Sequence, residues 1–141
     1  MTTFIDTAVI MYAAGGEHPL RDPSRRVLSR IGEGDLDGVI SVEVIQEIVH
    51  RFVSVRQSDI GQTQATDAMD FFAPVLPITH ALMRRVPDLA RKYPSLAARD
   101  LVHVATCIHE GITEIISPDR GFDQVAEIRR IDPTAFAAAP A

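Results

Sequence analysis

Carboxylates in uncharged surroundings are the residues of this sequence best suited to chemistry. Asp6 interrupts the apolar run of residues 4–10, and Asp100 lies in a stretch, 96–108, that is apolar on nearly every side when drawn as a helix. Such a helix is usually buried, and an ionised carboxylate is costly to bury without a cation or several hydrogen-bond donors. Asp100 is therefore predicted to bind a metal ion or to act in catalysis.

Each of these two acids also has a structural interpretation. Asp6 precedes a predicted helix, where aspartate is a preferred N-cap. Asp100 has a candidate partner in His103, one turn further along, whereas the side chain of neighbouring Arg99 points in a different direction. Capping and pairing are compatible with a role in chemistry, so both interpretations stay open.

A third acid comes from the helix predicted to begin after Ser41. Glu43 and Glu47 are one turn apart on this helix and compete for a single role. The helix dipole already accounts for a negative charge at Glu43, in the first turn, but it does not account for Glu47. Glu47 is therefore the preferred candidate.

A fourth acid lies in the segment 117–123, which contains both Asp119 and Asp123. Pro118 and Gly121 favour a turn here, and turn chemistry alone would explain an aspartate. Asp119, however, follows a strand that should lie beside the first strand, so we expect it at the site. Asp123 is kept as a candidate additional acid.

Together these candidates indicate one type of reaction. Carboxylates that converge on one end of a sheet repel one another unless a cation joins them. Oxygen ligands favour Mg²⁺ or Mn²⁺ over zinc, and such an ion can activate water and stabilise the leaving oxygen of a phosphodiester. We therefore predict a metal-assisted phosphodiester hydrolase whose catalytic and metal-binding residues are Asp6, Glu47, Asp100 and Asp119.

Other chemistries fit the sequence less well. A zinc site would have to use His103 with Cys107 or His109, and such residues on an apolar helix are more often part of the core. A phosphatase with a covalent aspartate needs an acid two residues after its nucleophile, but Asp6 is followed at that distance by Ala8.

The elements that must position these acids alternate along the chain. Short apolar segments predict strands at 2–5, 38–40, 75–78, 114–117 and 128–131, the third of them at an edge because of Pro77. Helices are predicted at 7–14, 23–32, 41–52, 59–73, 80–92 and 95–109. This order indicates an α/β fold with a short, mostly parallel sheet flanked by helices, whose ligands lie beyond the carboxyl ends of the strands.

Length and composition narrow the class of protein. The chain has 141 residues and a formal net charge of −5, which suits one domain and disfavours non-specific coating of nucleic acid. We expect one domain, 1–133, followed by an Ala-rich tail, 134–141. No apolar stretch is long enough to cross a membrane, no secretion signal opens the chain, and the one cysteine excludes a disulfide framework, so a cytoplasmic protein is expected.

The four acidic segments, in this order and at these intervals, resemble those of PIN-domain ribonucleases, specifically the VapC-type toxins of bacterial toxin–antitoxin pairs. The resemblance covers nearly the whole chain. It is carried by residues 4–9, by 40–47 with Glu47, by the helical motif 98–105 with Asp100, and by 117–123 with Asp119 and Phe122. Pro118 departs from the family pattern, since many relatives have a small polar or amide residue there.

The resemblance implies a PIN-like three-layer fold and Mg²⁺- or Mn²⁺-dependent endonuclease action on RNA. It also implies a homodimer and a cognate antitoxin whose tail covers the acidic pocket. By this resemblance Asp6 and Asp100 are direct metal ligands, Glu47 binds the metal or its water, and Asp119 orients the attacking water. Only some relatives have an acid at the position of Asp123.

The RNA has to be held by local positive charge, because the chain as a whole is acidic. The candidate cations are Arg25, Arg26, Arg30, Arg84, Arg85, Arg91, Lys92 and Arg99, most of which would equally suit ordinary solvated helix faces. The alternative function is a catalytically weak protein-binding module, in which the acidic pocket binds an arginine of a basic partner peptide. Both functions use the same acids, so the sequence leaves them open.

Overall fold

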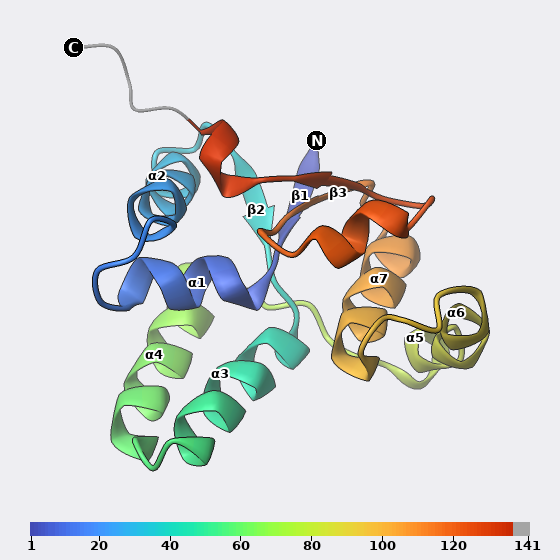
Figure 1. Ribbon diagram of the computed structural model, residues 1–141, viewed down its shortest axis with the longest axis horizontal. Helices are drawn as coiled ribbons and strands as arrows, with labels where there is room; N and C mark the ends of the chain where they lie inside the picture. The colour runs from blue at the N-terminus through green and yellow to red at the C-terminus, as the bar shows by residue number, and fades with distance from the viewer. Residues whose placement is uncertain (137–141) are drawn as a thin grey trace.

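A four-stranded parallel sheet forms the centre of the computed structural model, which describes residues 1–136 (Figure 1). The strands are β1 (Thr2–Ile5), β2 (Asp37–Val39), β3 (Glu114–Ile116) and β4 (Arg129–Ile131), in the order β2-β1-β3-β4. β1 and β3 are largely buried and end in apolar residues, as expected for strands covered on both faces.

Helices surround this sheet on both sides. In Figure 1, α1 (Thr7–Ala14) and α2 (Arg21–Gly32) lie to the left of the strands, and α5 (His80–Met83), α6 (Val86–Lys92) and α7 (Ala98–Glu110) lie to the right. The hairpin of α3 (Val42–Ser54) and α4 (Ser58–Phe71) extends below the carboxyl ends of β1 and β2. The predicted α/β fold with a short parallel sheet between helices is thus confirmed.

The strand order indicates where a ligand site would lie. β1 lies between β2 and β3, so the chain changes direction across the sheet at β1. Ile5 pairs with Ile116 in the parallel ladder, and the residues that follow these two strands leave the sheet side by side. Ligand sites of open α/β sheets lie at such a switch in strand order.

Several predicted helix ends are confirmed in detail. The side chain of Ser41 accepts a hydrogen bond from the backbone N–H of Glu43, and that of Thr79 accepts one from Leu82, so both residues are N-caps. Gly111 ends α7 in the left-handed conformation with φ 70°, which favours glycine.

Two predicted elements are wrong, and proline explains both. The segment 75–78 forms no strand; only Leu76 pairs, in a single parallel bridge with Ser41, because Pro77 has no N–H to continue a ladder. The helix predicted over 80–92 is divided into α5 and α6 between Met83 and Val86, because the ring of Pro87 does not fit in the interior of a helix.

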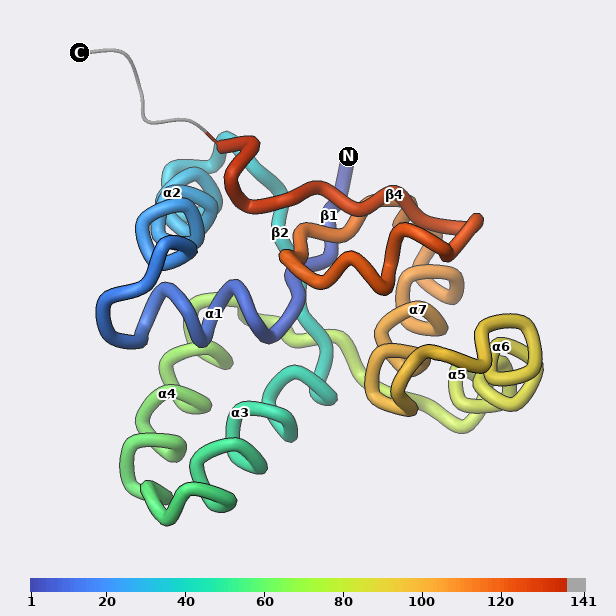
Figure 2. The backbone as a smooth tube through the Cα atoms, viewed as in Figure 1, coloured from blue at the N-terminus to red at the C-terminus, as the bar shows by residue number. Residues whose placement is uncertain are grey.

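The C-terminal part of the described chain returns to α2, as the tube in Figure 2 shows. After β4, a short 3-10 helix, η2 (Pro133–Ala135), leads to Phe136, whose carbonyl accepts a hydrogen bond from Arg26 and whose ring lies 5.8 Å from the guanidinium carbon of Arg30. Of the tail predicted for 134–141, residues 137–141 lie outside the described residues. Within the described range, none of the helices has the length and apolar character needed to cross a membrane.

Candidate active site

The carboxyl ends of β1 and β3 bring two site residues together. Asp6 directly follows β1, and its backbone N–H donates to the carbonyl of Ile116 at 3.0 Å. Ser117 directly follows β3, is fully buried, and donates from its hydroxyl to Oδ2 of Asp6 at 2.6 Å. Asp6 itself makes no capping hydrogen bond with its side chain, so its carboxylate is directed to the sheet edge rather than to α1.

Helices α3 and α7 add the other acids. Glu47 lies in the middle of α3, and Asp100 lies in the first turn of α7. Together with Asp6 and Asp119 they line one cavity of about 430 Å³, which we call the acidic cleft. Sequence reasoning thus selected four acids from separate elements, and the structure brings them to one place. Glu43, the alternative to Glu47, does not line this cleft.

A histidine that sequence analysis considered both as a partner for Asp100 and as a zinc ligand lies beneath the acids. His103 of α7 is fully buried; its Nε2 is in close contact with Oε1 of Glu47 and lies 3.8 Å from Oδ1 of Asp6. Its ring also packs against Phe4, with the ring centroids 5.2 Å apart. Although burial opposes the charged form, these two carboxylates raise the pKa of His103. The imidazole therefore offsets part of the negative charge of the cleft.

The acids themselves are short of positive charge. Burial raises the pKa of Asp6, and Glu47 adds to this, while His103 and Ser117 act in the opposite direction. Burial, together with the charges of Asp6, Asp119 and Glu47, raises the pKa of Asp100 to about 6. Carboxylates with raised pKa values in a cleft are typical of functional sites.

The donor set fits a hard divalent cation. All four acids offer carboxylate oxygens, and Oε1 of Glu47 is buried without a hydrogen-bond donor of suitable geometry. Among residues 1–136, no group of three or more His, Cys, Asp or Glu side chains is already arranged to hold a metal ion. The candidate zinc ligand Cys107 is buried, and burial raises the pKa of its thiol to about 12.

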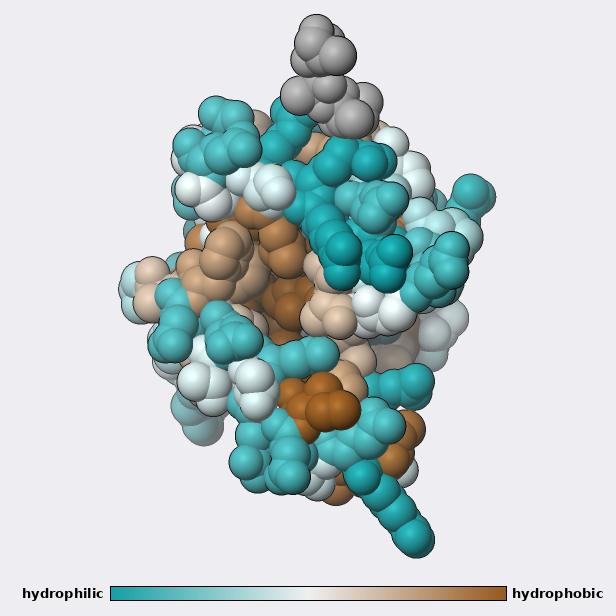
Figure 3. Space-filling model, turned by 90° about the vertical axis from the view of Figure 1, so that its left-hand side faces the viewer, coloured by the Kyte–Doolittle hydropathy of each residue, from teal (hydrophilic) through white to brown (hydrophobic). Residues whose placement is uncertain are grey.

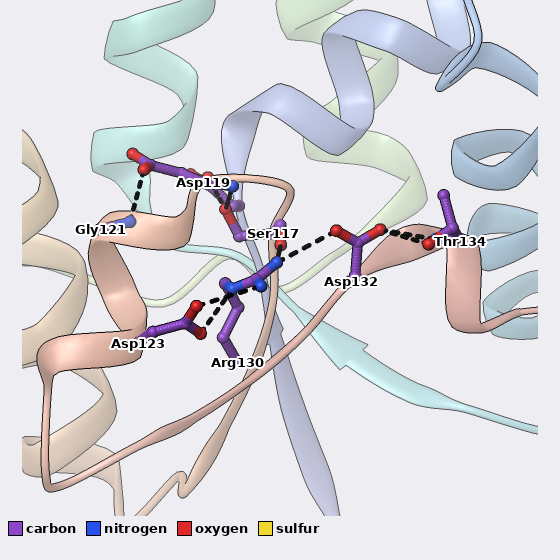
Figure 4. Close-up of polar contacts among 8 residues, drawn as sticks. Ser117, Asp119, Gly121, Asp123, Arg130, Asp132 and Thr134 are labelled. Carbon is purple, nitrogen blue, oxygen red and sulfur yellow. Dashed lines mark hydrogen bonds and ion pairs between the residues drawn. The ribbon is translucent and has the colours of Figure 1, made fainter.

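Asp119 and Asp123 have different surroundings although they are neighbours in sequence (Figure 4). The side chain of Asp119 accepts from the backbone N–H of Gly121 at 2.8 Å, which is the predicted turn, and it also lines the acidic cleft. Asp123 does not line the cleft; its carboxylate pairs with Arg130, with Nε and Oδ1 2.8 Å apart. The turn interpretation and the site interpretation are thus compatible for Asp119.

Two arginines stand on the walls of the cleft. Arg51 lies one turn after Glu47 on α3, and Arg99 precedes Asp100 on α7. Of the eight candidate RNA-binding cations, only Arg99 lines the cleft; Arg25, for example, donates to the carbonyl of Ala13. The sequence signal for Arg51 was its spacing of four residues from Glu47.

A second cavity, of about 480 Å³, lies between α1, α2 and α4 and is mostly apolar. Figure 3 shows a hydrophobic hollow on the face that lies to the left in Figure 1. Residues such as Ile10, Leu28 and Phe71 line this cavity, and none of the four predicted acids does. The four predicted acids therefore all lie at the acidic cleft and none at this second cavity.

Comparison with known proteins adds independent information. The PIN domain family profile matches residues 3–128. The chain is 33% identical to VapC ribonuclease Mb1869c of Mycobacterium bovis over 90% of its own length and 97% of that protein. It is 35% identical to Ribonuclease VapC23 of Mycobacterium tuberculosis over 79% of its own length and 88% of that protein.

Solved structures show the same fold at low sequence identity. VapBC2 from Rickettsia felis, crystallised with a DNA fragment from its promoter, aligns with a TM-score of 0.69 at 14% identity and covers 94% of this chain. FitAcB from Neisseria gonorrhoeae aligns with a TM-score of 0.70 at 16% identity, again over 94% of this chain. In each case 98% of the solved chain is covered.

Proposed function

The chain belongs to the PIN domain family, and from this premise we propose that it is a VapC-type endoribonuclease toxin held inactive by a cognate antitoxin. The observation that carries the proposal is the acidic cleft, where acids from four separate segments meet and the pKa of Asp100 is raised to about 6. The similar proteins named as VapC ribonucleases supply the reaction class.

We assign the metal-binding role to the carboxylates of the cleft. Asp6 and Asp100 would hold Mg²⁺ or Mn²⁺ directly, Glu47 would hold the ion or its water, and Asp119 would complete the site. When bound, the ion would lower the pKa of a water molecule and neutralise charge at the scissile phosphate. This role accounts for the surplus of negative charge in the cleft.

Other residues of the chain prepare these acids. The hydroxyl of Ser117 fixes one oxygen of Asp6 by its hydrogen bond, which limits rotation of that carboxylate. His103 contacts Glu47 and lies near Asp6 from the side of the core. The opposite sides of both carboxylates therefore remain available to a ligand in the cleft. Asp119 stands at the edge of the cleft, where it is suited to orient an attacking water.

RNA would enter between the two arginines of the cleft walls. Arg51 and Arg99 offer positive charge from α3 and α7 in the lining of the cleft, in a chain whose net charge is −5. Phosphates next to the scissile one provide the complementary charge, and such local cations can steer a polyanion to an acidic protein.

The proposed assembly is a homodimer that binds the antitoxin. The apolar residues of α1 and α2 line the second cavity together with α4 and offer one candidate surface for the dimer. α3 offers another apolar surface, where Val42, Val49 and Val53 are 44%, 37% and 55% exposed. Light scattering of the purified wild type and of Val53→Lys would test whether the apolar surface of α3 holds the dimer.

The test of function is cleavage of total cellular RNA by antitoxin-free protein with Mg²⁺, Mn²⁺ or EDTA, beside Asp100→Asn. We expect discrete fragments with either metal and none with EDTA or with the variant. Fragment sizes would indicate the RNA that is cut. A folded wild-type protein that cuts no RNA under any of these metals would overturn the nuclease assignment and favour the binding module.

A further inference from the structure

Arg130 of β4 is the centre of a polar network beside the acidic cleft, and its side chain is only 11% exposed. Its guanidinium donates to both oxygens of Asp123, at 2.8 and 3.3 Å, and to Oδ2 of Asp132 at 3.2 Å (Figure 4). We call Asp123, Arg130 and Asp132 the Arg130 network. The two carboxylates hold the planar guanidinium in one orientation. A lysine ammonium is a point charge and could not be fixed in this way.

The same guanidinium reaches the backbone of the site. Its Nη1 donates to the carbonyl oxygen of Ser117 at 3.0 Å, and the N–H of Ser117 donates to the carbonyl of Ile131 at the same distance. Both backbone groups of Ser117 are therefore held by β4. This matters because the turn that carries Asp119 begins at Ser117.

Ser117 passes this restraint to two acids of the cleft. Its hydroxyl donates to Asp6 and accepts from the backbone N–H of Asp119 at 3.0 Å. A change in the position of Ser117 would thus alter the separation of the Asp6 and Asp119 carboxylates. Second-layer contacts of this kind orient metal-binding groups in many proteins.

We propose that Arg130 is a positioning residue of the active site, which fixes the Ser117–Asp119 turn through the Ser117 carbonyl, with Asp123 and Asp132 as its anchors. This inference rests on the proposed nuclease function for its effect on catalysis. It also gives Asp123 a place: the carboxylate that the sequence marked as an additional acid acts on the site through Arg130 rather than from the cleft.

The test compares Arg130→Met and Arg130→Lys with Arg129→Met. Arg129 is a matched control because it lies on the same strand, its side chain is 74% exposed, and it forms an ion pair with Glu114 away from the cleft. The measurements are kcat and KM for RNA cleavage, the thermal midpoint, and hydrogen exchange of the backbone amides of Ser117 and Asp119.

For Arg130→Met we expect kcat to fall about 10–100-fold, the range seen when second-layer contacts are removed, and KM to stay close to that of the wild type. The amide of Asp119 should exchange faster, while amides of β1 keep their protection. Arg130→Lys should give intermediate values, and Arg129→Met should leave all three measurements close to those of the wild type.

Unchanged kcat and unchanged exchange at Asp119 in Arg130→Met would overturn the inference. If that variant does not fold, Arg130→Lys and Asp123→Asn decide instead: faster exchange confined to the turn supports a positioning role, and wild-type exchange there refutes it. If the wild type cuts no RNA, the proposed function fails, yet the exchange comparison still decides whether Arg130 fixes the turn.

Discussion

Two acid-rich regions adjoin at Ser117 and differ in how their charges are matched. In the acidic cleft, four carboxylates share one buried histidine and two arginines on the walls. In the Arg130 network, two carboxylates meet a guanidinium that satisfies both, and Asp132 also accepts from the hydroxyl and N–H of Thr134. The carboxylates of the first region are only partly satisfied within the fold, whereas both carboxylates of the second accept hydrogen bonds from Arg130.

The pKa directions express the same difference. Burial and neighbouring acids raise the pKa of Asp100 to about 6, whereas hydrogen bonds from Arg130 lower the pKa of Asp123. For Asp132, burial acts upward, but hydrogen bonds from Thr134 and Arg130 lower its pKa overall. An acid whose charge is not satisfied within the fold is the better candidate for binding something else, and an acid already satisfied is the better candidate for support.

The largest contrast is expected in activity. Asp6→Asn removes a proposed metal ligand and should lower the rate of RNA cleavage by at least about 100-fold, as loss of one group that stabilises the transition state does. Asp123→Asn removes one anchor of Arg130 and should cost less than about tenfold. Single-turnover cleavage assays of both variants measure this difference, and equal losses would remove the distinction between the two regions.

The second largest effect is expected in the pH dependence of metal binding by the acidic cleft. As the pH falls through about 6, Asp100 takes up a proton, and the neutral carboxyl group no longer binds a cation. We expect affinity for Mn²⁺ to fall about tenfold per pH unit below that point, the dependence expected for one competing proton. Calorimetric titration with MnCl₂ between pH 5 and 8 measures it. An affinity independent of pH, or one retained in Asp100→Asn, would contradict the assignment of Asp100.

The arginines of the cleft walls should have a smaller effect, on binding alone. Arg51→Gln and Arg99→Gln should each weaken RNA binding several-fold. Each should also reduce the slope of log K against log salt concentration by about 0.7, the value for one phosphate contact with a single strand. Fluorescence anisotropy at several NaCl concentrations, in EDTA to prevent cleavage, is the measurement. Arg85→Gln is the matched control, because Arg85 is exposed and does not line the cleft; an equal loss in this variant would indicate unspecific attraction.

The smallest contrast is expected in stability, where the two regions should give opposite signs. The folded-state pKa of Asp100 is raised, so its stabilising contribution is present at low pH and lost as the pH rises through about 6. Asp100→Asn should therefore raise the thermal midpoint of the metal-free protein at pH 8, by about 2–5 °C, and have little effect near pH 4.

Asp123 should behave in the reverse way. Its folded-state pKa is lowered, so its contribution is present at neutral pH and lost as the pH falls through that lowered value. Asp123→Asn should lower the midpoint at pH 8 by less than Asp100→Asn raises it, since exposed pairs contribute little. Calorimetry of both variants at pH 8 in EDTA decides, and midpoints that move in the same direction would contradict the comparison.

Sequence reasoning located the acids of the cleft because their local context was anomalous. Asp100 in an apolar helix and Asp6 at a strand end are signals that depend only on neighbours in the chain. Asp119 was preferred to Asp123 because it follows a predicted strand, but the partner of Asp123, Arg130, could not be predicted, because that pair depends on the folded contact between β4 and the turn.

The misses have the same origin. The position of His103 between Asp6 and Glu47 requires the packing of α7 against α3 and β1, which periodicity does not supply. The alternating order of elements was enough to predict the parallel sheet. The segment around Leu76 is apolar enough for a strand, but Pro77 has no backbone N–H to pair, so only a single bridge forms. Local pattern therefore predicted most elements, and tertiary contacts decided the supporting residues.

The order of the strands also determines when the site is assembled during synthesis. The hydrogen bond from Ser117 to Asp6 spans 111 residues of sequence, and β3 in turn pairs with β4 near the end of the described chain. A chain still on the ribosome has therefore made Asp6, Glu47 and Asp100 before the segment that completes the cleft exists. The acidic cleft is therefore complete only after residues 114–131 have been synthesised and have joined the sheet.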